Sequence, residues 1–136
     1  MGAWGHLAFD NDTAGDWADG LEDVDDLSLV ESALEELEVV EDQYLDQDVA
    51  CNALAACEVI ARLHGHPGYT NPYTEKVDQW VSEHKLKPSL ALLKRATNAI
   101  DRILGGESEL RKLWEEGDEA DVWQESVKDL QRRMQK

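Results

Sequence analysis

A run of polar residues near the start of the chain resembles the first half of a calcium-binding loop. In the segment 10–15, Asp10 and Asp12 supply carboxylates at the first and third positions. Such a loop also needs oxygen ligands at the fifth and twelfth positions, where this chain has Ala14 and Leu21. Because two oxygens are missing, we interpret Asn11 or Asp12 as the cap of a helix that begins there.

The other candidates for metal chemistry are His64 and His66, with Glu58 a little earlier in the chain. No two of the four histidines have the i, i+4 spacing that metalloprotease helices use. We therefore predict structural histidines, no metal and no other cofactor. The alternative is a small metal-dependent or small-molecule enzyme with a site between helices, using Asp12, Asp16 and either His64 or His66.

The two cysteines, Cys51 and Cys57, are six residues apart in one helical pattern. On a helix they point about 120° away from each other, so they are poorly placed to form a disulfide. We expect small buried thiols in a reducing cytoplasm. No histidine lies where the local sequence would let it activate either thiol, and no Gly-x-Ser-x-Gly or phosphate-binding glycine loop occurs. The sequence predicts no catalytic residue and favours a non-enzymatic protein.

Charge divides the chain unevenly. Residues 1–50 contain sixteen Asp or Glu and no Lys or Arg, whereas the rest contains fourteen acidic and thirteen basic residues. The first part therefore carries −16 of the net charge of −17. Such a surface repels nucleic acid and anionic membranes. No apolar run approaches the ~18 residues of a membrane span, so we expect a cytoplasmic protein with neither partner.

Four of these acids, Glu31, Glu35, Glu38 and Asp42, follow one another at spacings of four, three and four, which places them on one stripe of a helix. Three interpretations fit this stripe. A basic protein partner neutralises it, or it is a solvated face typical of an organism with a salty cytoplasm. In the third, the segment 85–102, which has five basic residues against one acidic residue, packs nearby and relieves the repulsion.

Hydrophobic spacing predicts the elements that position these residues. Apolar residues recur every three or four positions from Leu27 to Tyr44, and Ser28 with Glu31 forms a capping box, so we predict a helix over 28–42. A second helix, apolar nearly all round and therefore central, is expected over 47–64 between Asp46 and Gly65. Further helices are expected over about 72–84, 88–104 (with Leu90 on its inner face), 108–116 and up to Met134, with Gly117 kinking or separating the last two.

The opening of the chain is rich in large aromatic residues, and each can bury about 150–250 Å². We expect this segment to be a structural anchor in the core, with the residues Trp4, Phe9, Asn11, Asp12 and Trp17. No run alternates as a strand would. The sequence therefore predicts a single all-α domain over 1–136, a compact bundle of about six helices with the N-terminal aromatic segment packed into the core.

Sequence similarity to known proteins lies in the segment 1–5, Phe9, Asn11-Asp12, Ala14, Asp16-Trp17, the segment 53–61, Ser108-Glu109-Leu110, Leu113 to Glu116, Trp123 and Leu130. Through these residues the chain resembles a bacterial domain-of-unknown-function family, the one numbered 4259. The resemblance covers nearly the whole chain. It implies a small prokaryotic protein without an assigned activity, and it supplies no catalytic residue.

From these observations we expect a cytoplasmic helical module that binds another protein through its acidic N-terminal half. Its role would be that of an inhibitor, an immunity-type protein or an adaptor. A concentrated negative charge speeds the encounter with a basic surface. The oligomeric state does not follow from the sequence.

Overall fold

The computed structural model describes residue 5, residues 7–40 and residues 43–136. In these residues the chain forms seven α-helices and two short 3₁₀ helices, and an isolated bridge pairs Leu45 with Ser108. The elements are α1 (Asp12–Asp19), η1 (Gly20–Asp23), α2 (Ser28–Glu38), α3 (Gln47–Leu63), η2 (Pro72–Thr74), α4 (Glu75–Glu83), α5 (Leu90–Ile103), α6 (Glu109–Glu115) and α7 (Ala120–Gln135). The all-α prediction is confirmed.

The helix count differs from the expected six because the chain breaks between α6 and α7. The residues from Glu116 to Glu119 are not helical, and they include Gly117 and Asp118, which favour turns. Gly117 therefore separates two helices instead of kinking one. In the described residues no helix is both long enough and apolar enough to cross a membrane.

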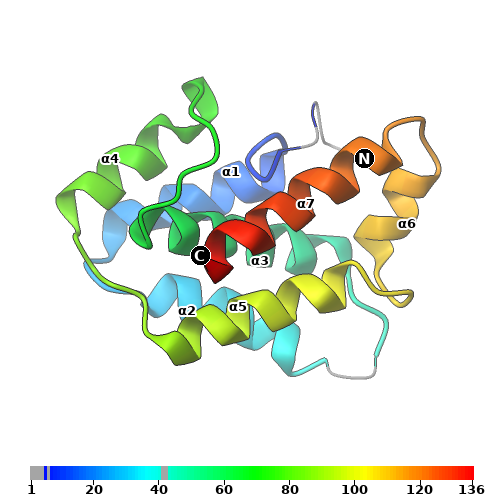
Figure 1. The fold of residues 1–136 in the computed structure, drawn as a ribbon, viewed down its shortest axis with the longest axis horizontal. Coiled ribbons are helices and arrows are strands. Elements are labelled where there is room, and N and C mark those ends of the chain that lie inside the picture. The colour runs from blue at the N-terminus through cyan, green and yellow to red at the C-terminus, as the bar shows by residue number, and fades with distance from the viewer. Residues whose placement is uncertain (1–4, 6, 41–42) are drawn as a thin grey trace.

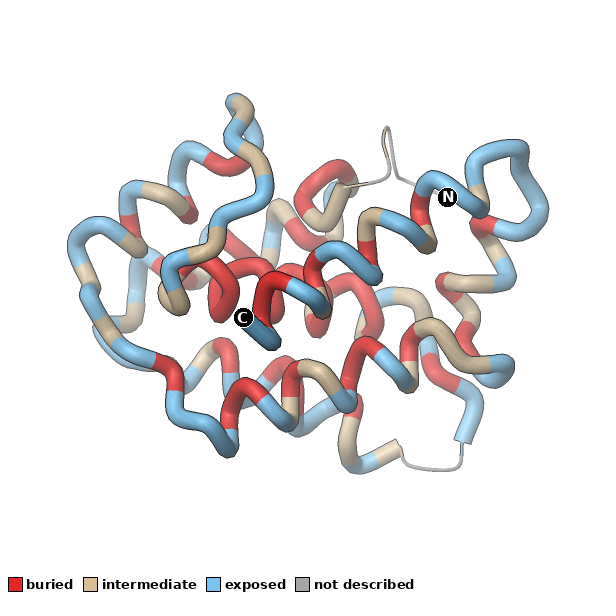
Figure 2. Tube along the Cα trace, viewed as in Figure 1, coloured by how far each residue is buried: buried red, intermediate tan, exposed pale blue. Residues whose placement is uncertain are grey.

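Helix α3 is the centre of the fold, as its apolar circumference predicts. Each of the other six α-helices of the described residues contacts it (Figure 1). Buried positions follow one another along almost its whole length (Figure 2). Its five alanines from Ala50 to Ala61 are all fully buried, and a side chain this small lets neighbouring helices approach closely. The predicted signals at its ends are confirmed, since Asp46 accepts hydrogen bonds from the N–H groups of Asp48 and Val49, and Gly65 adopts a φ of 91°.

Helix α1 begins where the polar run predicts. The side-chain oxygen of Asn11 accepts a hydrogen bond from the N–H of Ala14 at 2.8 Å, so Asn11 is the cap and Asp12 is the first helical residue. Phe9 is buried and Trp17 is half-buried against the core. Trp4 lies outside the described residues, so the packing of the complete aromatic segment stays a prediction.

Helix α2 is shorter than the predicted 28–42, because it ends at Glu38. The chain turns after it, so that Leu45 is fully buried while Tyr44 is 47% exposed, and the apolar stripe does not extend to Tyr44. The backbone of Leu45 exchanges hydrogen bonds with Glu107 and Glu109, which fixes it beside the start of α6. The predicted capping box is also wrong in detail. Ser28 is the first helical residue, and its N–H donates to Asp26.

Helix α5 places Leu90 differently from the prediction. The hydroxyl of Ser89 accepts the N–H of Leu92 at 3.1 Å, so the helix starts at Leu90, which faces solvent and is 86% exposed. The first buried positions are Leu92 and Leu93, and the stripe continues through Ala96, Ile100 and Ile103. The first residue of a helix can face solvent while the buried stripe begins in the next turn. The spacing of apolar residues alone therefore assigned Leu90 to the wrong side of the helix.

Candidate functional site

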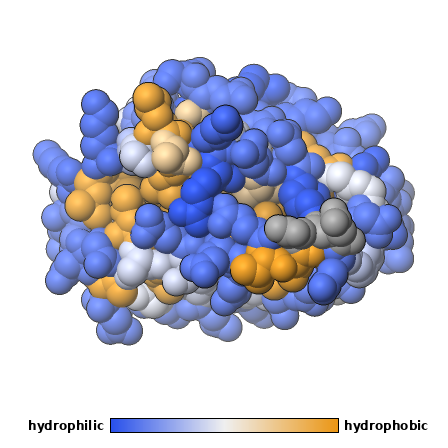
Figure 3. All heavy atoms as spheres, turned by 90° about the horizontal axis from the view of Figure 1, so that it is seen from below, coloured by the Kyte–Doolittle hydropathy of each residue, from blue (hydrophilic) through white to orange (hydrophobic). Residues whose placement is uncertain are grey.

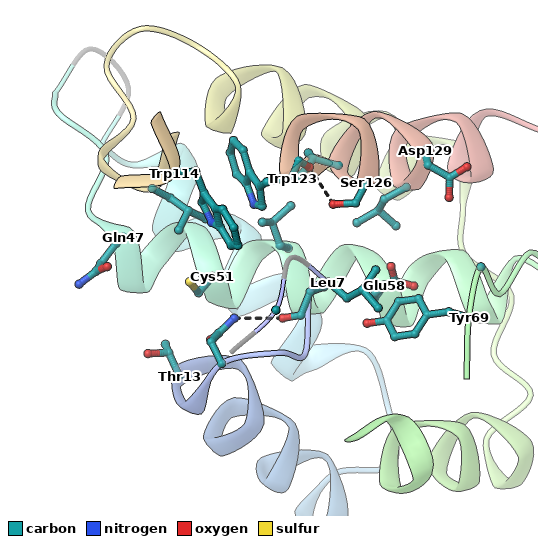
Figure 4. Close-up of a pocket in the computed structure, with 18 of the residues that line it drawn as sticks. Leu7, Thr13, Gln47, Cys51, Glu58, Tyr69, Trp114, Trp123, Ser126 and Asp129 are labelled. Carbon is teal, nitrogen blue, oxygen red and sulfur yellow. Dashed lines mark hydrogen bonds between the residues drawn. The ribbon is translucent and has the colours of Figure 1, made fainter. Parts of the chain in front are cut away.

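A pocket of about 170 Å³ lies between the segment before α1, helices α3, α6 and α7, and the loop at Gly68 and Tyr69. Figure 4 shows Thr13, Gln47 and Cys51 toward one end and Glu58 and Tyr69 toward the other. Its wall includes apolar side chains from four parts of the chain: Leu7, Leu54, Leu110, Trp114, Trp123, Val127 and Leu130. Concave sites with an apolar lining and a few polar groups are the usual form of small-molecule sites.

The inner end of the pocket is formed by a buried ion pair between α3 and α7. The guanidinium of Arg133 donates to both carboxylate oxygens of Glu58, with nitrogen–oxygen distances of 3.0 Å and 2.7 Å. Burial alone disfavours the charged arginine, but the hydrogen bonds and charges of Glu58 and Asp129 outweigh it, so the pKa of Arg133 lies above its ordinary value. Arg133 therefore stays charged, and it faces the carboxylate of Glu58 at 2.7 Å.

Arg62 extends this network toward α4. Its side chain is almost fully buried and donates to the backbone oxygen of Tyr69 at 2.6 Å. Its guanidinium also lies 3.2 Å from a carboxylate oxygen of Asp78 and 3.7 Å from one of Glu58. The charged group sits over the Tyr69 ring at 5.1 Å from its centroid. These contacts fix Tyr69, whose hydroxyl accepts the N–H of Phe9.

Gly68 closes the pocket because no side chain fits there. A Cβ at this position would lie 2.5 Å from the Cζ atom of Arg133, far inside van der Waals contact. The backbone of residue 68 therefore lies close beside the guanidinium. Neither this glycine nor Arg133 was predicted as a site residue. The one available signal was a lone Glu58 among apolar residues of α3, since a buried carboxylate needs a partner.

The pocket wall also contains two tryptophans from α6 and α7. The rings of Trp114 and Trp123 are nearly parallel, at 8°, with centroids 6.1 Å apart. Both side chains are largely buried, and Trp114 lies toward the same end of the pocket as Cys51 (Figure 4). Burial, with the charges of Asp48 and Asp46 adding to it, raises the pKa of Cys51 to about 12. The thiol is therefore protonated at neutral pH and is a poor nucleophile.

The second cysteine has no role in the pocket. Cys57 is fully buried, and burial raises the pKa of its thiol as well. Its sulfur lies 3.7 Å from the backbone oxygen of Ala96 on α5. Both cysteines are free, as the sequence indicates.

The carboxylates of the predicted stripe on α2 differ in whether they have a basic partner. Glu31 and Glu35 are exposed on α2, but Glu38 is paired with Arg95 of α5 through two hydrogen bonds of 2.9 Å. That pairing raises the pKa of Arg95, mainly through the hydrogen bond to Glu38. The third interpretation of the stripe, in which the basic segment 85–102 packs nearby and relieves the repulsion between the acids, therefore holds at this one residue pair. Asp42 lies beyond the end of α2 and outside the described residues.

The residues of the alternative enzyme hypothesis do not form one site. Asp12 and Asp16 both line a second hollow between α1 and Tyr73, and Asp12 also lines the first pocket. His64 and His66 line neither; their rings are 5.3 Å apart, and His64 contacts the backbone oxygen of Lys136. Within the described part of the chain, no three His, Cys, Asp or Glu side chains gather as metal ligands would.

Fold and pocket together define a small helical protein built on one alanine-rich central helix. The chain belongs to the family described as "Domain of unknown function (DUF4259)", whose model matches residues 2–126 of the 136. The family resemblance carried by the opening residues and the helical segments is thereby confirmed. No curated protein and no solved structure matches the chain significantly.

Proposed function

We propose that this protein binds a basic partner protein through its acidic N-terminal half, as an inhibitor, immunity-type protein or adaptor of the cytoplasm. The supporting observation is how its carboxylates are distributed. Among the described residues of α1, η1 and α2, seven acids are exposed and have no ion pair within 4.0 Å: Asp12, Asp16, Glu22, Asp23, Glu31, Glu35 and Glu36.

The internal compensation of this charge is small. Of the first 50 residues, Asp19, Asp25 and Glu38 have basic partners in the described part of the chain. Two of these partners, Lys76 and His84, come from α4 and the residue after it. The pair between Lys76 and Asp19 is exposed on both sides, so it adds little to stability.

Helices α1 and α2 follow each other in the chain with η1 between them, and both pack on α3. The view from below shows the side of α2 and α5 as mostly hydrophilic, with smaller hydrophobic areas (Figure 3). Exposed carboxylates without basic partners raise the rate of association with positive surfaces by long-range attraction. A basic protein is therefore the partner that this surface favours.

The test is affinity capture from extracts of the source organism with charge-reversed variants. The variant Glu31→Lys/Glu35→Lys reverses two exposed acids of α2 and leaves the pair between Glu38 and Arg95 intact. The matched control is Glu116→Lys/Asp118→Lys, which makes the same charge change at exposed residues after α6. We expect a basic protein that the wild type and the control capture and the α2 variant loses. The proposal is wrong if the α2 variant captures everything that the wild type does.

The metal-dependent alternative has a separate test. If elemental analysis of the purified protein found zinc, iron or manganese in stoichiometric amount, the metal-dependent enzyme would be favoured over the protein-binding module.

A further inference from the structure

The pocket has the size of a small ring compound. Its volume of about 170 Å³ is close to that of an engineered apolar cavity of about 150 Å³ that binds benzene. Leu54, Leu110 and Val127 contribute aliphatic surface, and Trp114 and Trp123 contribute aromatic surface. The parallel rings of Trp114 and Trp123, with centroids 6.1 Å apart, leave no room for a ligand between them. A ligand would therefore contact the ring surfaces that line the pocket.

Atoms of the chain already accept hydrogen bonds from several of the helix N–H groups at one end of the pocket. Helices α1 and α3 both begin at the end of the pocket near Thr13 and Gln47, and helix N-termini attract anions through free N–H groups. Here the N–H of Gln47 donates to Glu109 at 2.8 Å, and the N–H groups of Asp48 and Val49 donate to Asp46. The N–H of Ala14 in α1 is likewise bound, by the side chain of Asn11. An anionic ligand therefore finds these donors already taken.

Two carboxylates remain at the same end. Asp12 and Asp48 line the pocket, and neither has a basic partner within 4.0 Å in the described residues. Asp48 accepts a hydrogen bond from the hydroxyl of Thr13 at 3.2 Å, which holds it across the mouth from α1. Trp114 lies toward this end as well (Figure 4). A cation placed here would be attracted both by the carboxylates and by the face of an indole ring.

The opposite end adds no competing charge. The positive charge of Arg133 is offset by Glu58, with Asp129 also bound to its Nε at 3.0 Å. Tyr69 keeps its proton, since burial raises the pKa of its hydroxyl, and it supplies a neutral polar group. The electrostatic preference of the pocket is therefore set at its Asp12 and Asp48 end.

We propose that this pocket binds a small organic cation, an amine with one aromatic or aliphatic ring. The ring lies against the apolar wall formed by Trp114, Trp123, Leu54 and Val127, and the ammonium group lies between Asp12 and Asp48. This site shares Asp12 with the acids proposed to bind a protein, but it includes no residue of α2, and its test with small ring compounds does not depend on a protein partner.

The test compares three ring compounds of similar shape and different charge: benzylammonium, benzyl alcohol and benzoate. Binding is followed by tryptophan fluorescence and by ligand-observed NMR. We expect a Kd of about 0.1–1 mM for benzylammonium, in the range open to a ligand of this size. Benzyl alcohol should bind about ten-fold more weakly, because it lacks the charge, and benzoate more weakly still.

Variants locate the site. Asp12→Asn and Asp48→Asn should each weaken benzylammonium about three- to ten-fold and leave benzyl alcohol unchanged, since only a charge is removed. Asp16→Asn, an exposed acid on α1 that does not line this pocket, is the control and should change nothing. Circular dichroism confirms that each variant is folded. The proposal is overturned if none of the compounds binds, if the three bind equally, or if Asp16→Asn weakens benzylammonium as much as the pocket variants do.

Discussion

Glu58 and Arg133 are 75 residues apart in the chain, yet their charged groups meet at 2.7 Å and 3.0 Å with both side chains almost fully excluded from water. Arg133 also donates to Asp129 on its own helix and to the backbone oxygen of His66. One side chain thus joins the central helix α3, the last helix α7 and the loop after α3. The pair closes the inner end of the pocket.

Breaking this pair should be costly. Glu58→Gln keeps the shape of the side chain but removes its charge, leaving a buried guanidinium incompletely neutralised, and we expect a loss of about 3–5 kcal/mol in the free energy of unfolding. Urea denaturation measures it. The control, Glu125→Gln, breaks an exposed pair with Arg132 and should cost less than about 1 kcal/mol. Equal effects of the two variants would show that burial of the pair does not matter.

Whether a glycine-to-alanine substitution raises or lowers the free energy of unfolding should depend on the atoms around that glycine. Gly68→Ala places a Cβ 2.5 Å from Arg133 Cζ and should lower the free energy of unfolding by about 1–3 kcal/mol. Gly15→Ala lies within α1, where nothing stands within 4 Å of the new Cβ, and should raise it by about 0.5–1 kcal/mol. Thermal and urea denaturation measure both. A stabilising Gly68→Ala would contradict the packing of residue 68 on Arg133.

His84 should make stability depend on pH. Its Nε2 lies 3.0 Å from Asp25; this hydrogen bond first, and the one to the backbone oxygen of Trp80 second, raise the pKa of His84. The charged form therefore favours the folded state. This contribution is complete below the unfolded-state value of about 6.5 and is lost as the pH rises through the higher folded value.

The comparison is between the wild type and His84→Gln. The difference in their Tm should shrink as the pH is raised from about 6 to about 8.5, because only the wild type titrates a histidine there. Asp25→Asn should reduce the same pH dependence without removing the imidazole. A difference in Tm that stays constant or grows over this range would contradict the assignment.

Salt should stabilise the protein. The exposed acids of α1, η1 and α2 repel one another, and added ions shorten the Debye length to about 10 Å at 0.1 M. We expect the Tm to rise between about 0.01 M and about 0.3 M sodium chloride. The control Glu31→Lys/Glu35→Lys should show a smaller rise because part of the repulsion is gone. A Tm that is flat or falls with salt would mean that ion pairs outweigh the repulsion.

Local signals in the sequence predicted the helical fold well. Asn11 and Asp46 are caps where short polar side chains precede an apolar pattern, and each accepts a helix N–H as expected. Such interactions join residues only two or three positions apart, so the chain order reveals them. The apolar circumference of α3 likewise predicted its central place.

Prediction failed where distant residues decide the outcome. Helix α2 ends before Tyr44 because Leu45 pairs with the backbone at the start of α6, more than 60 residues away. Glu58 was considered as a metal ligand, yet its partner is Arg133. Residue 68 is glycine because a side chain there would collide with the same arginine. No local pattern connects these residues, because only the packing of α7 on α3 brings them together.

The central claim, that the acidic surface of α2 binds a basic partner, is tested most directly by the association rate with the captured partner. Stopped-flow or surface-plasmon measurements would compare the wild type, Glu31→Lys/Glu35→Lys and the control Glu116→Lys/Asp118→Lys. We expect the α2 variant to associate about ten-fold more slowly at low salt, with the difference reduced by added salt, and the control to differ less than about two-fold. Equal rates for the two charge-reversed variants would contradict the claim.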